Sequence, residues 1–426
     1  MIIKKTVEIG GKLVTLEVGR MARLAHGSAV MTIGESIVLC TACSSDPRPG
    51  IDFFPLTIDY REKTYAAGKI PGGFFKREGR PTTKEVLSCR LIDRPLRPLF
   101  AEGYNDEVQV LCNVLSFDAI HNTDVMAGTT GSMALMLSPI PLLGPVAWVR
   151  VGHLDGQLVL YPDDNRMKES KLDLVVAGTK EAVTMVEAGM DELDESTVLD
   201  AIDMAHGAIK QLCDLQTEVL QAAGVTPARE TYVGPEDSNA PLRDLVRDRY
   251  KAEVRDKIVA PSKPERQQNL KPIVEKAVEA LGDLEETGAE GKWPVKAVKR
   301  ALRDIGDEVL RELILEGTRV DGRGPTDIRD ISCEVGILPR AHGSALFTRG
   351  ETQAIVGATL GTGRDEEIID GLAEEYKKNF YLHYNFPPFS VGEVRPMRGT
   401  SRREIGHGNL AERALAKVVP DAESFP

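Results

Sequence analysis

The feature that most constrains the fold of this chain is a large internal duplication. The motif Ala-His-Gly-Ser-Ala at 25–29 recurs at 341–345, an offset of 316 residues. Four more identities keep this offset, pairing Thr32, Gly34, Glu35 and Ala42 with Thr348, Gly350, Glu351 and Ala358. Because solenoid repeats have periods of about 20–50 residues, this offset indicates a whole domain that is present twice.

A second echo joins two basic motifs. Lys-Arg-Glu at 76–78 matches Arg-Arg-Glu at 402–404, now at an offset of 326 residues. We therefore expect the second copy to carry ten inserted residues between its strands and this motif.

The first copy has the sequence pattern of an α+β domain. Alternating residues from Val7 to Val18 around Gly10-Gly11 predict a hairpin, and residues 28–42 predict two further strands that turn near Gly34. An apolar stripe from Ser196 to Val219 predicts a long helix that Gly224 ends. Strands followed by helices favour an α+β fold, and we place the first domain at residues 1–226.

The remaining chain divides into a helical linker domain and a shorter second copy. Residues 227–316 are highly charged and form amphipathic patterns separated by Pro and Gly, which predicts a small all-α domain. Residues 317–426 begin the second copy but are only about half as long as the first. We therefore expect a truncated second copy.

Composition excludes several classes of protein. A net charge of −12 argues against a protein that coats nucleic acid by bulk charge. Lys4 and Lys5 come too early for a secretory signal, and Pro139, Pro141 and Pro145 interrupt the most apolar stretch. Six cysteines in so long a chain do not indicate a disulfide framework. We expect a cytoplasmic protein without membrane contact, and we interpret Cys40 and Cys43 as two buried strand thiols rather than half a zinc site.

Two local regions are basic despite the acidic total. Residues 61–97 hold ten basic and four acidic residues, and within them Phe74 and Phe75 precede Lys76 and Arg77. Exposed rings beside cations suit single-stranded nucleic acid, where bases stack and phosphates are neutralised. The alternative is that the two phenylalanines plug the core, since adjacent residues of an extended chain point opposite ways.

The second basic region covers residues 395–417, with six basic and two acidic residues. Arg402 and Arg403 precede a Gly-His-Gly turn around His407, which could bind a phosphate group through paired guanidinium groups and an imidazole. A solvated helix N-terminus with incidental arginines is the alternative. His26 and His342 lack the surroundings of a nucleophile motif, and we expect both at strand-turn positions.

These motifs, taken together and in order, resemble the bacterial polynucleotide phosphorylase family. The resemblance rests on four segments and covers essentially the whole chain: residues 74–81, 91–98, 340–353 and 402–408. It implies two RNase PH-like domains, built from βαβ units like those of some ribosomal proteins and joined by a small all-α domain.

The resemblance also implies an activity. Such enzymes are ring-shaped homotrimers that draw single-stranded RNA into a channel, where inorganic phosphate attacks the terminal phosphodiester. They release nucleoside diphosphates in a reversible 3′→5′ phosphorolysis that serves mRNA degradation. An endoribonuclease of an RNA degradosome is a possible partner.

Residue roles follow from the same resemblance. It assigns Arg402, Arg403 and His407 to the phosphate and RNA 3′-end site. It assigns RNA contact to a second group, namely Phe74, Phe75, Lys76, Arg77, Arg90, Arg94 and Arg97.

The family's Mg²⁺ (or Mn²⁺) chemistry implies an Asp-x5-Asp-x-Lys motif and a serine-rich phosphate turn. In the first copy the three motif positions hold Met167, Asp173 and Val175, and one carboxylate does not hold Mg²⁺ well. We therefore interpret the first copy as a non-catalytic RNA guide and Gly128–Ser132 as structural. We expect the metal ligands to lie beyond Pro426, none within this chain, and the chain alone to be inactive.

Two alternatives remain in view. One is a non-catalytic RNA-binding ring subunit of an exosome-like assembly: an Asp-x5-Asp-x-Lys motif after residue 426 would support the enzyme, and its absence would support this subunit. The other is a tRNA-trimming RNase PH relative, which the duplication and the helical insert disfavour.

Overall fold

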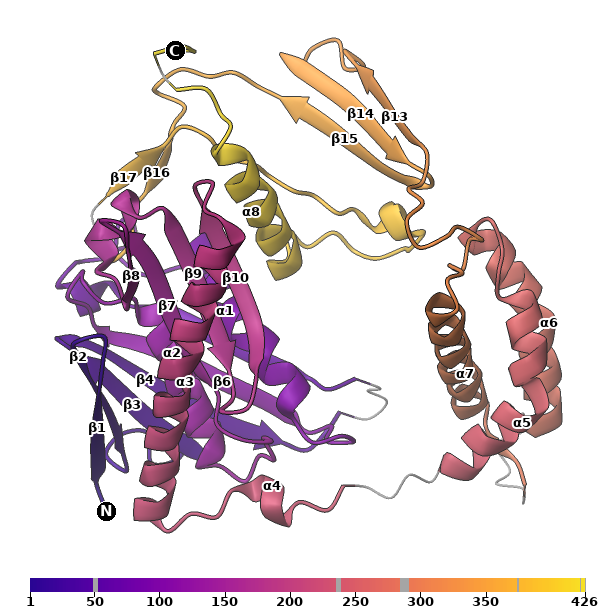
Figure 1. Cartoon of the computed structure of the whole chain (residues 1–426), viewed down its shortest axis with the longest axis horizontal. Helices are drawn as coiled ribbons and strands as arrows, with labels where there is room; N and C mark the ends of the chain where they lie inside the picture. The colour runs from indigo at the N-terminus through magenta and orange to yellow at the C-terminus, as the bar shows by residue number, and fades with distance from the viewer. Residues whose placement is uncertain (49–52, 235–238, 284–290, 374, 422, 426) are drawn as a thin grey trace. The chain divides into compact units, whose positions relative to one another are not determined.

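The computed structural model describes residues 1–48, 53–234, 239–283, 291–373, 375–421 and 423–425 (Figure 1). The chain forms two compact units, one of residues Met1–Pro235 with Gly363–Pro426 and the other of Glu236–Thr362. These two units are defined by which residues contact one another in space, whereas the expected domain boundaries at 226 and 316 are inferred from the duplication in the sequence. Those boundaries therefore stay a prediction.

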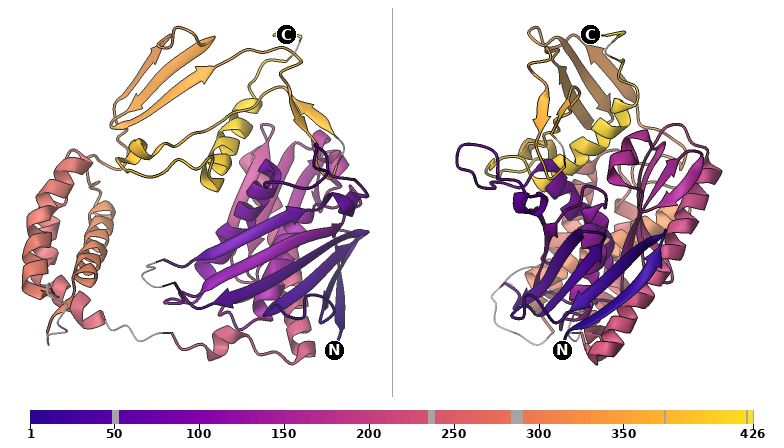
Figure 2. Two further views of the ribbon diagram at one scale, coloured as in Figure 1. Left: turned by 180° about the vertical axis from the view of Figure 1, so that it is seen from behind. Right: turned by 90° about the vertical axis from the view of Figure 1, so that its left-hand side faces the viewer.

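The first copy contains two sheets. The six-stranded sheet has the order β1-β2-β3-β4-β6-β5, and the four-stranded sheet has the order β10-β9-β7-β8 (Figure 2). Strands β5 and β6 pair in parallel, and the connection between them contains helix α1, which gives the expected βαβ unit. The strands are β1 (Ile3–Ile9), β2 (Lys12–Val18), β3 (Gly27–Ile33), β4 (Ser36–Ser45), β5 (Leu56–Glu62), β6 (Glu107–Ser116), β7 (Ala147–Leu154), β8 (Gln157–Leu160), β9 (Leu172–Gly178) and β10 (Val183–Met190).

The predicted hairpins and the long helix are confirmed. Gly10 and Gly11 have φ of +59° and +74°, the backbone that a two-residue turn of this hand requires, and they join β1 to β2. Helix α3 (Glu195–Ala223) begins after Asp194, which accepts a hydrogen bond from the Thr197 amide at 2.7 Å, and ends at Gly224 with φ of +66°.

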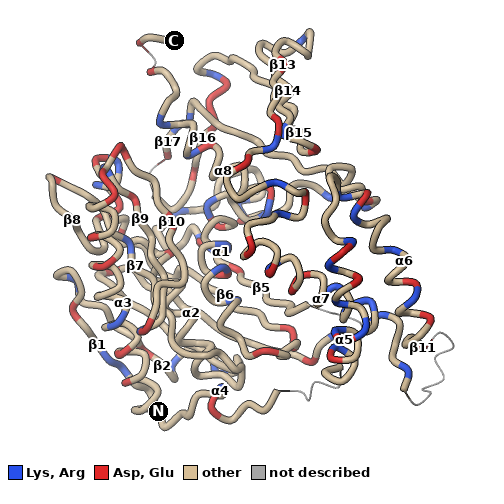
Figure 3. Tube along the Cα trace, turned by 45° about the vertical axis from the view of Figure 1, so that its right-hand side comes forward, with Lys and Arg blue, Asp and Glu red and all other residues tan. Residues whose placement is uncertain are grey.

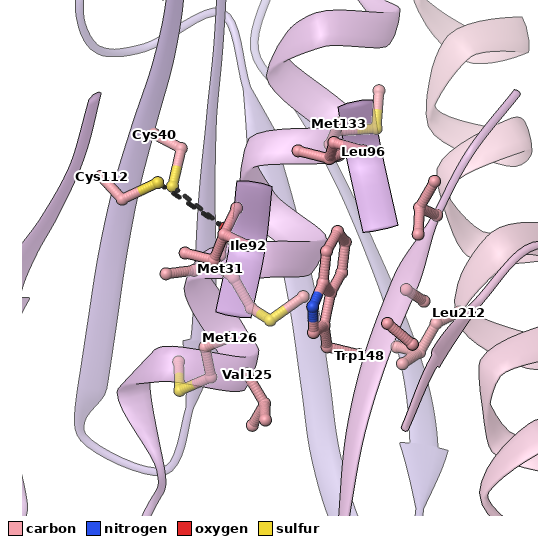
Figure 4. Packing of buried hydrophobic residues seen from close by; sticks show 14 of the residues in the cluster. Met31, Cys40, Ile92, Leu96, Cys112, Val125, Met126, Met133, Trp148 and Leu212 are labelled. Atoms are coloured by element: carbon pink, nitrogen blue, oxygen red, sulfur yellow. Dashed lines mark hydrogen bonds between the residues drawn. The ribbon is translucent and has the colours of Figure 1, made fainter. Parts of the chain in front are cut away.

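Helix α2 (Thr123–Met136) forms a layer between the two sheets and is buried on all sides. A Cβ on Gly128 would lie 2.4 Å from the ring of Trp148, so only glycine fits there. The Thr129 hydroxyl accepts a hydrogen bond from the Trp148 amide, and Ser132 donates one to Gln216. The expected structural role of residues 128–132 is confirmed, and Figure 4 shows Trp148 within this core.

The cysteine prediction is half wrong. Cys40 is buried in the core, as Figure 4 shows, but Cys43 on the same strand is exposed. Residues three apart on a strand point to opposite faces, which is the physical reason for the difference.

The helical region has its own core and an ion-pair ladder. Helices α5, α6 and α7 pack around buried side chains such as Val246, Ile305 and Val309. Between the two copies, the described residues form the helices α4 (Ala228–Thr231), α5 (Ala240–Lys257), α6 (Lys263–Leu281) and α7 (Val295–Leu315) and the short paired strands β11 (Gly282–Asp283) and β12 (Trp293–Pro294). Three basic residues of α5 pair with two acidic residues of α7 and with the residue that ends it: Arg247, Lys251 and Arg255 with Glu308, Glu312 and Glu316. Figure 3 colours the basic and acidic residues along the backbone.

The duplication is confirmed in the strands of the second copy. At the offset of 316, β3 falls on β14 and the start of β4 falls on β15, and both pairs are antiparallel. The two histidines make the same contact: His26 Nδ1 accepts from the Ser44 amide at 3.1 Å, and His342 Nδ1 from the Leu360 amide at 2.9 Å. Both histidines therefore hold strand turns, as expected. The strands are β13 (Ile331–Val335), β14 (Gly343–Arg349) and β15 (Thr352–Ala358).

The proposed echo at an offset of 326 is wrong. Helix α8 (Arg402–Ala416) begins with a capping box between Ser401 and Glu404, and α1 (Thr83–Leu96) begins with the same box between Thr82 and Glu85. These boxes are 319 residues apart. Arg402–Glu404 therefore corresponds to the start of α1 and not to residues 76–78.

A further correspondence lies just before these helices. The short turns η1 (Thr64–Ala67) and η4 (Pro388–Val391) are 324 residues apart and end at Gly68 and Gly392, with φ of +66° and +69°. Glu85 accepts a hydrogen bond from the Glu62 amide at 2.9 Å, and Glu404 accepts one from the Phe386 amide at 2.8 Å. The second copy therefore gains eight residues before η4 and loses five after it.

The strands of the second copy are more exposed than their counterparts in the first copy. Val356 on β15 is 53% exposed, whereas its counterpart Cys40 is fully buried beneath α2. The described part of the second copy contains no counterpart of α2 or β6. Residues 380–386, which correspond to β5, form no strand there because β5 pairs only with β6. Two short strands precede this segment, β16 (Glu367–Ile369) and β17 (Tyr376–Lys378).

No helix in the described ranges is both long enough and apolar enough to cross a membrane.

One carboxylate joins the β3–β4 turn to the end of β6. Asp118 accepts hydrogen bonds from the Ser36 hydroxyl at 2.8 Å, from the Glu35 amide and from the His121 ring at 2.6 Å. Burial alone would raise the pKa of Asp118, but the hydrogen bonds from Ile120, His121 and Ser36 outweigh it and lower that pKa.

We predict that Asp118→Asn lowers the free energy of unfolding by about 1–3 kcal/mol, because several donors lose a charged acceptor. The lowered pKa means that this stabilisation is present above about pH 4 and is lost as the pH falls through the folded-state pKa. Denaturant unfolding of both proteins from pH 3 to pH 7 measures the difference. A difference that grows toward acid would contradict this assignment.

Candidate nucleotide and phosphate site

The predicted phosphate site lies at the start of α8, in the unit formed by the first copy and residues 363–426. The capping box makes Arg402 the first residue of the helix, so His407 lies within the helix and not in the expected Gly-His-Gly turn. Arg403 and His407 are four residues apart and therefore share one face of α8.

Arg402 and Arg403 have different surroundings. Arg402 donates to the Ile58 carbonyl at 2.6 Å and pairs with Asp59, both on β5. Burial would lower the pKa of Arg402, but the Asp59 carboxylate outweighs it and raises that pKa. In contrast, the exposed Arg403 makes no ion pair with any described residue. Arg402 is an anchor in this structure, and its phosphate role stays a prediction.

Aromatic rings line the exposed face of α8. The Arg403 guanidinium lies 5.9 Å from the ring centroid of Phe386, and the His407 ring lies 4.5 Å from that of Tyr384. Tyr384 and Phe386 belong to the extended segment that the Glu404 hydrogen bond holds against the helix. This arrangement places one cation and one imidazole beside two rings, which suits a phosphate next to a nucleobase.

Glycine allows α8 to approach α1 closely. A Cβ on Gly406 would lie 2.2 Å from Nε of Arg90, so the Arg90 side chain lies directly over this glycine. A Cβ on Gly408 would lie 3.2 Å from Cβ of Tyr384. The two glycines around His407 therefore serve packing, and Arg90 has no ion-pair partner among the described residues.

Arg94 on α1 and Arg97, which follows its last residue, have structural partners. Arg94 donates to the Val186 carbonyl at 2.9 Å and lies 3.7 Å from Glu187. Arg97 pairs with Asp93 at 2.7 Å and donates to the carbonyls of Phe54 and Leu56. Their expected RNA contacts stay a prediction, while the structure gives both a role in the fold.

The loop before α1 is fully accessible. Phe74 and Phe75 are 92% and 88% exposed, and their rings meet edge to face with centroids 5.5 Å apart. Lys76 and Arg77 have no ion-pair partner among the described residues. The alternative in which these phenylalanines plug the core is therefore wrong.

A cleft of about 680 Å³ lies between α1, α8 and residues 367–385. Its two main cations are neutralised, since Lys84 pairs with Glu62 at 2.8 Å and Lys378 with Glu412 at 2.6 Å. The cleft therefore offers shape and aromatic surface rather than free positive charge.

The first copy does not fit a magnesium site. Asp173 lies 3.6 Å from Arg150, which also pairs with Asp124 at 2.8 Å. Burial would lower the pKa of Arg150, but these carboxylates outweigh it and raise that pKa. Val175 is buried, and the described residues hold no group of three or more His, Cys, Asp or Glu that could bind a metal.

Sequence reasoning missed the residues that support this site. No local motif marks these residues, because each lies far in sequence from the residue of α8 that it contacts. They are Asp59, Glu187, Tyr384 and Phe386, which contact Arg402, Arg413, His407 and Arg403 in that order. The spacing of Gly68 and Gly392 is the signal that could have placed Tyr384 and Phe386, because it equates them with Tyr60 and Glu62 of β5.

Comparisons with known proteins match the whole chain. The model of the 3′ exoribonuclease family, domain 1, matches residues 11–141 and again 327–426, and domain 2 of that family matches residues 144–208. The RNA-binding domain of polyribonucleotide nucleotidyltransferase matches residues 241–324.

Several curated relatives are polyribonucleotide nucleotidyltransferases. Those of Sorangium cellulosum and Caulobacter vibrioides are 48% and 49% identical over 100% and 99% of this chain, which covers 56% and 59% of their lengths. This chain thus spans less than two thirds of such relatives. An Archaeoglobus fulgidus exosome with RNA bound to the active site aligns with a TM-score of 0.39 and 17% identity over 47% of this chain and 87% of that one. That weak similarity adds nothing to the sequence matches.

Glu187 on β10 forms ion pairs with equivalent arginines of the two copies. It pairs with Arg413 of α8 at 3.0 Å and with Arg94 of α1 at 3.7 Å. We predict that Glu187→Gln lowers stability by about 0.5–1 kcal/mol, because the groups are partly exposed. Thermal unfolding at low and at 1 M salt measures it, and the loss should shrink as salt screens the pairs. A loss that is equal at both salt concentrations would point to packing instead.

Proposed function

This chain belongs to the 3′ exoribonuclease family, and we propose that the whole protein is a polyribonucleotide nucleotidyltransferase that degrades single-stranded RNA by phosphorolysis. The observation that carries this proposal is the domain order. Two matches to the exoribonuclease domain flank one helical RNA-binding match, over a sequence about half identical to enzymes of that name.

The proposed reaction breaks one bond and forms another at the terminal phosphorus atom. An oxygen of inorganic phosphate attacks the last phosphodiester, and the P–O bond to the preceding 3′-oxygen breaks. The products are a nucleoside diphosphate and RNA shortened by one nucleotide, whose 3′-oxygen takes up a proton. Because a diester is exchanged for an anhydride of comparable energy, the reaction runs in both directions.

Residues of this chain would bring the two anions together. The Arg403 guanidinium makes no ion pair with the residues that the structure describes and can bind phosphate oxygens, and His407 on the same face can donate a hydrogen bond. Arg402 would act mainly by anchoring α8 through Asp59. Phe74, Phe75, Lys76 and Arg77 would hold the RNA strand further from its 3′ end, with Arg90 as an additional cation.

The proposal includes a metal ion only because the resemblance to the family implies one. Mg²⁺, or Mn²⁺ in its place, would stabilise charge on the transferred phosphoryl group. Asp173 stands alone opposite Arg150 and does not fit such an ion, so we derive no step through the metal from the residues described. For the same reason we propose that the 426-residue chain alone does not catalyse phosphorolysis.

Assembly and location complete the proposal. We propose a homotrimeric ring, action on mRNA in the cytoplasm, and an endoribonuclease as a possible degradosome partner. The support for the ring and the partner is the resemblance to the family alone.

The test of this function uses the full-length protein that contains this chain. It is incubated with oligo(A), Mg²⁺ and phosphate, and the mononucleotide products are separated by ion-exchange chromatography. ADP that appears only when phosphate is present supports the proposal. Release of AMP without phosphate would contradict it.

We predict that Arg403→Ala in the full-length protein raises the activation free energy of phosphorolysis by about 2–4 kcal/mol, the range for a lost electrostatic donor in the transition state. Steady-state ADP release at varied phosphate measures it, with the exposed Lys210→Ala on α3 as a control of equal charge change. An unchanged kcat/KM for phosphate would reject this role.

We also predict that Phe74→Ala with Phe75→Ala weakens binding of a 20-mer oligo(A) by at least about fivefold and of a 4-mer much less, because only the long strand reaches this loop. Fluorescence anisotropy measures both affinities. Equal losses for both lengths would argue against contact at a distance from the 3′ end.

A further inference from the structure

The second copy contains a counterpart of the exposed loop that precedes α1. Turns η1 and η4 correspond at an offset of 324, and each ends at a glycine with positive φ. Each turn carries an exposed aromatic residue at its second position, Tyr65 at 59% and Phe389 at 81%. Both loops therefore begin with the same kind of turn, which ends at a glycine with positive φ, although their sequences share little.

The loop at 387–400 exposes several apolar side chains. Val394 is fully exposed, Met397 is 81% exposed, and both lie within nine residues of Phe389. Apolar groups gathered at the surface indicate a site of interaction, because their hydration is unfavourable. Isolated exposed residues would need no such explanation, but this loop concentrates several of them.

Positive charge accompanies these apolar groups. Residues 394–403 contain four arginines and no acidic residue. Arg402 is held by Asp59, and Arg395 lies 4.0 Å from Glu393. Arg398 makes no hydrogen bond or ion pair with any residue in the described ranges, so its charge is free for a ligand.

We propose that the loop at 387–400 is a second binding site for single-stranded RNA, in which Phe389 stacks on a base and Arg398 contacts a phosphate. This inference rests on the proposed function, since it takes its ligand from it. An exposed ring and a cation without an ion pair among the described residues, both on one loop, suit a polyanion whose bases are unpaired. A protein partner could cover the apolar side chains of this loop, but only an acidic protein would also supply an anion for Arg398.

The experiment measures the affinity of the full-length protein for 5′-labelled 20-mer oligo(A) by anisotropy at several salt concentrations. Phe389→Ala should raise Kd at least about fivefold, because stacking on one base contributes that much or more. Arg398→Gln should lower the slope of log Kd against log salt by about 0.7, the value for one phosphate contact on a single strand.

Two matched controls change exposed residues elsewhere. Leu199→Ala removes an apolar side chain that is 62% exposed on α3, and Lys210→Gln removes an exposed cation from the same helix. Both should leave Kd and slope unchanged. Thermal unfolding should be the same for all four variants, because each residue is exposed.

The outcomes separate this inference from the proposed function. If the wild type binds oligo(A) and neither Phe389→Ala nor Arg398→Gln changes Kd or slope, the second site is overturned and the proposed function stands. If the variants change the sedimentation coefficient of the assembly but not the affinity for RNA, the loop is a protein interface and the inference is wrong. If the wild type does not bind oligo(A), both fail.

Discussion

The close packing of α8 on α1 is the constraint on which the candidate site depends. The two helices are equivalent elements of the duplicated domains, each started by a Ser or Thr capping box with a glutamate at its third position. Gly406 lets the helices approach until the Arg90 side chain lies over its backbone. A side chain at 406 would have to displace the Arg90 side chain, whereas the pair with Asp59 holds Arg402 and the start of α8 on β5. The position of Arg403 and His407 therefore depends on contacts between α8 and the first copy.

The duplication explains why equivalent residues now do different work. Glu85 and Glu404 each hold an incoming backbone amide, so the local architecture has been kept in both copies. The residues that follow have diverged: at the position of Arg403 the first copy has Lys84, which is paired with Glu62. At the carboxylate position that the family resemblance implies, the first copy pairs Asp173 with Arg150. In the first copy these charges are balanced within the fold, whereas Arg403 in the second copy makes no ion pair with any described residue.

Much of the fold could be predicted from the sequence because its signals are local. Glycine pairs, capping residues and apolar periodicity placed the hairpins and α3 within a few residues. The helical domain was predicted from its charge and from its Pro and Gly residues. The true counterpart of Arg402–Glu404 could not be predicted from two identical residues and one similar residue, because it depends on capping geometry that Thr82 and Ser401 share despite different neighbours. Burial of Cys43 was also misjudged, since the sequence does not say which face of β4 is covered.

The candidate site was only partly predictable. Arg402 and Arg403 looked like a matched pair, but Arg402 is anchored by Asp59 in the other copy, whereas Arg403 lies over the Phe386 ring and forms no ion pair within the described residues. The most direct measurement is a double-mutant cycle on Arg402→Ala and Asp59→Ala, followed by denaturant unfolding. Packing of α8 on the first copy predicts a coupling free energy of at least about 0.5 kcal/mol. Strictly additive effects of the two substitutions would contradict it.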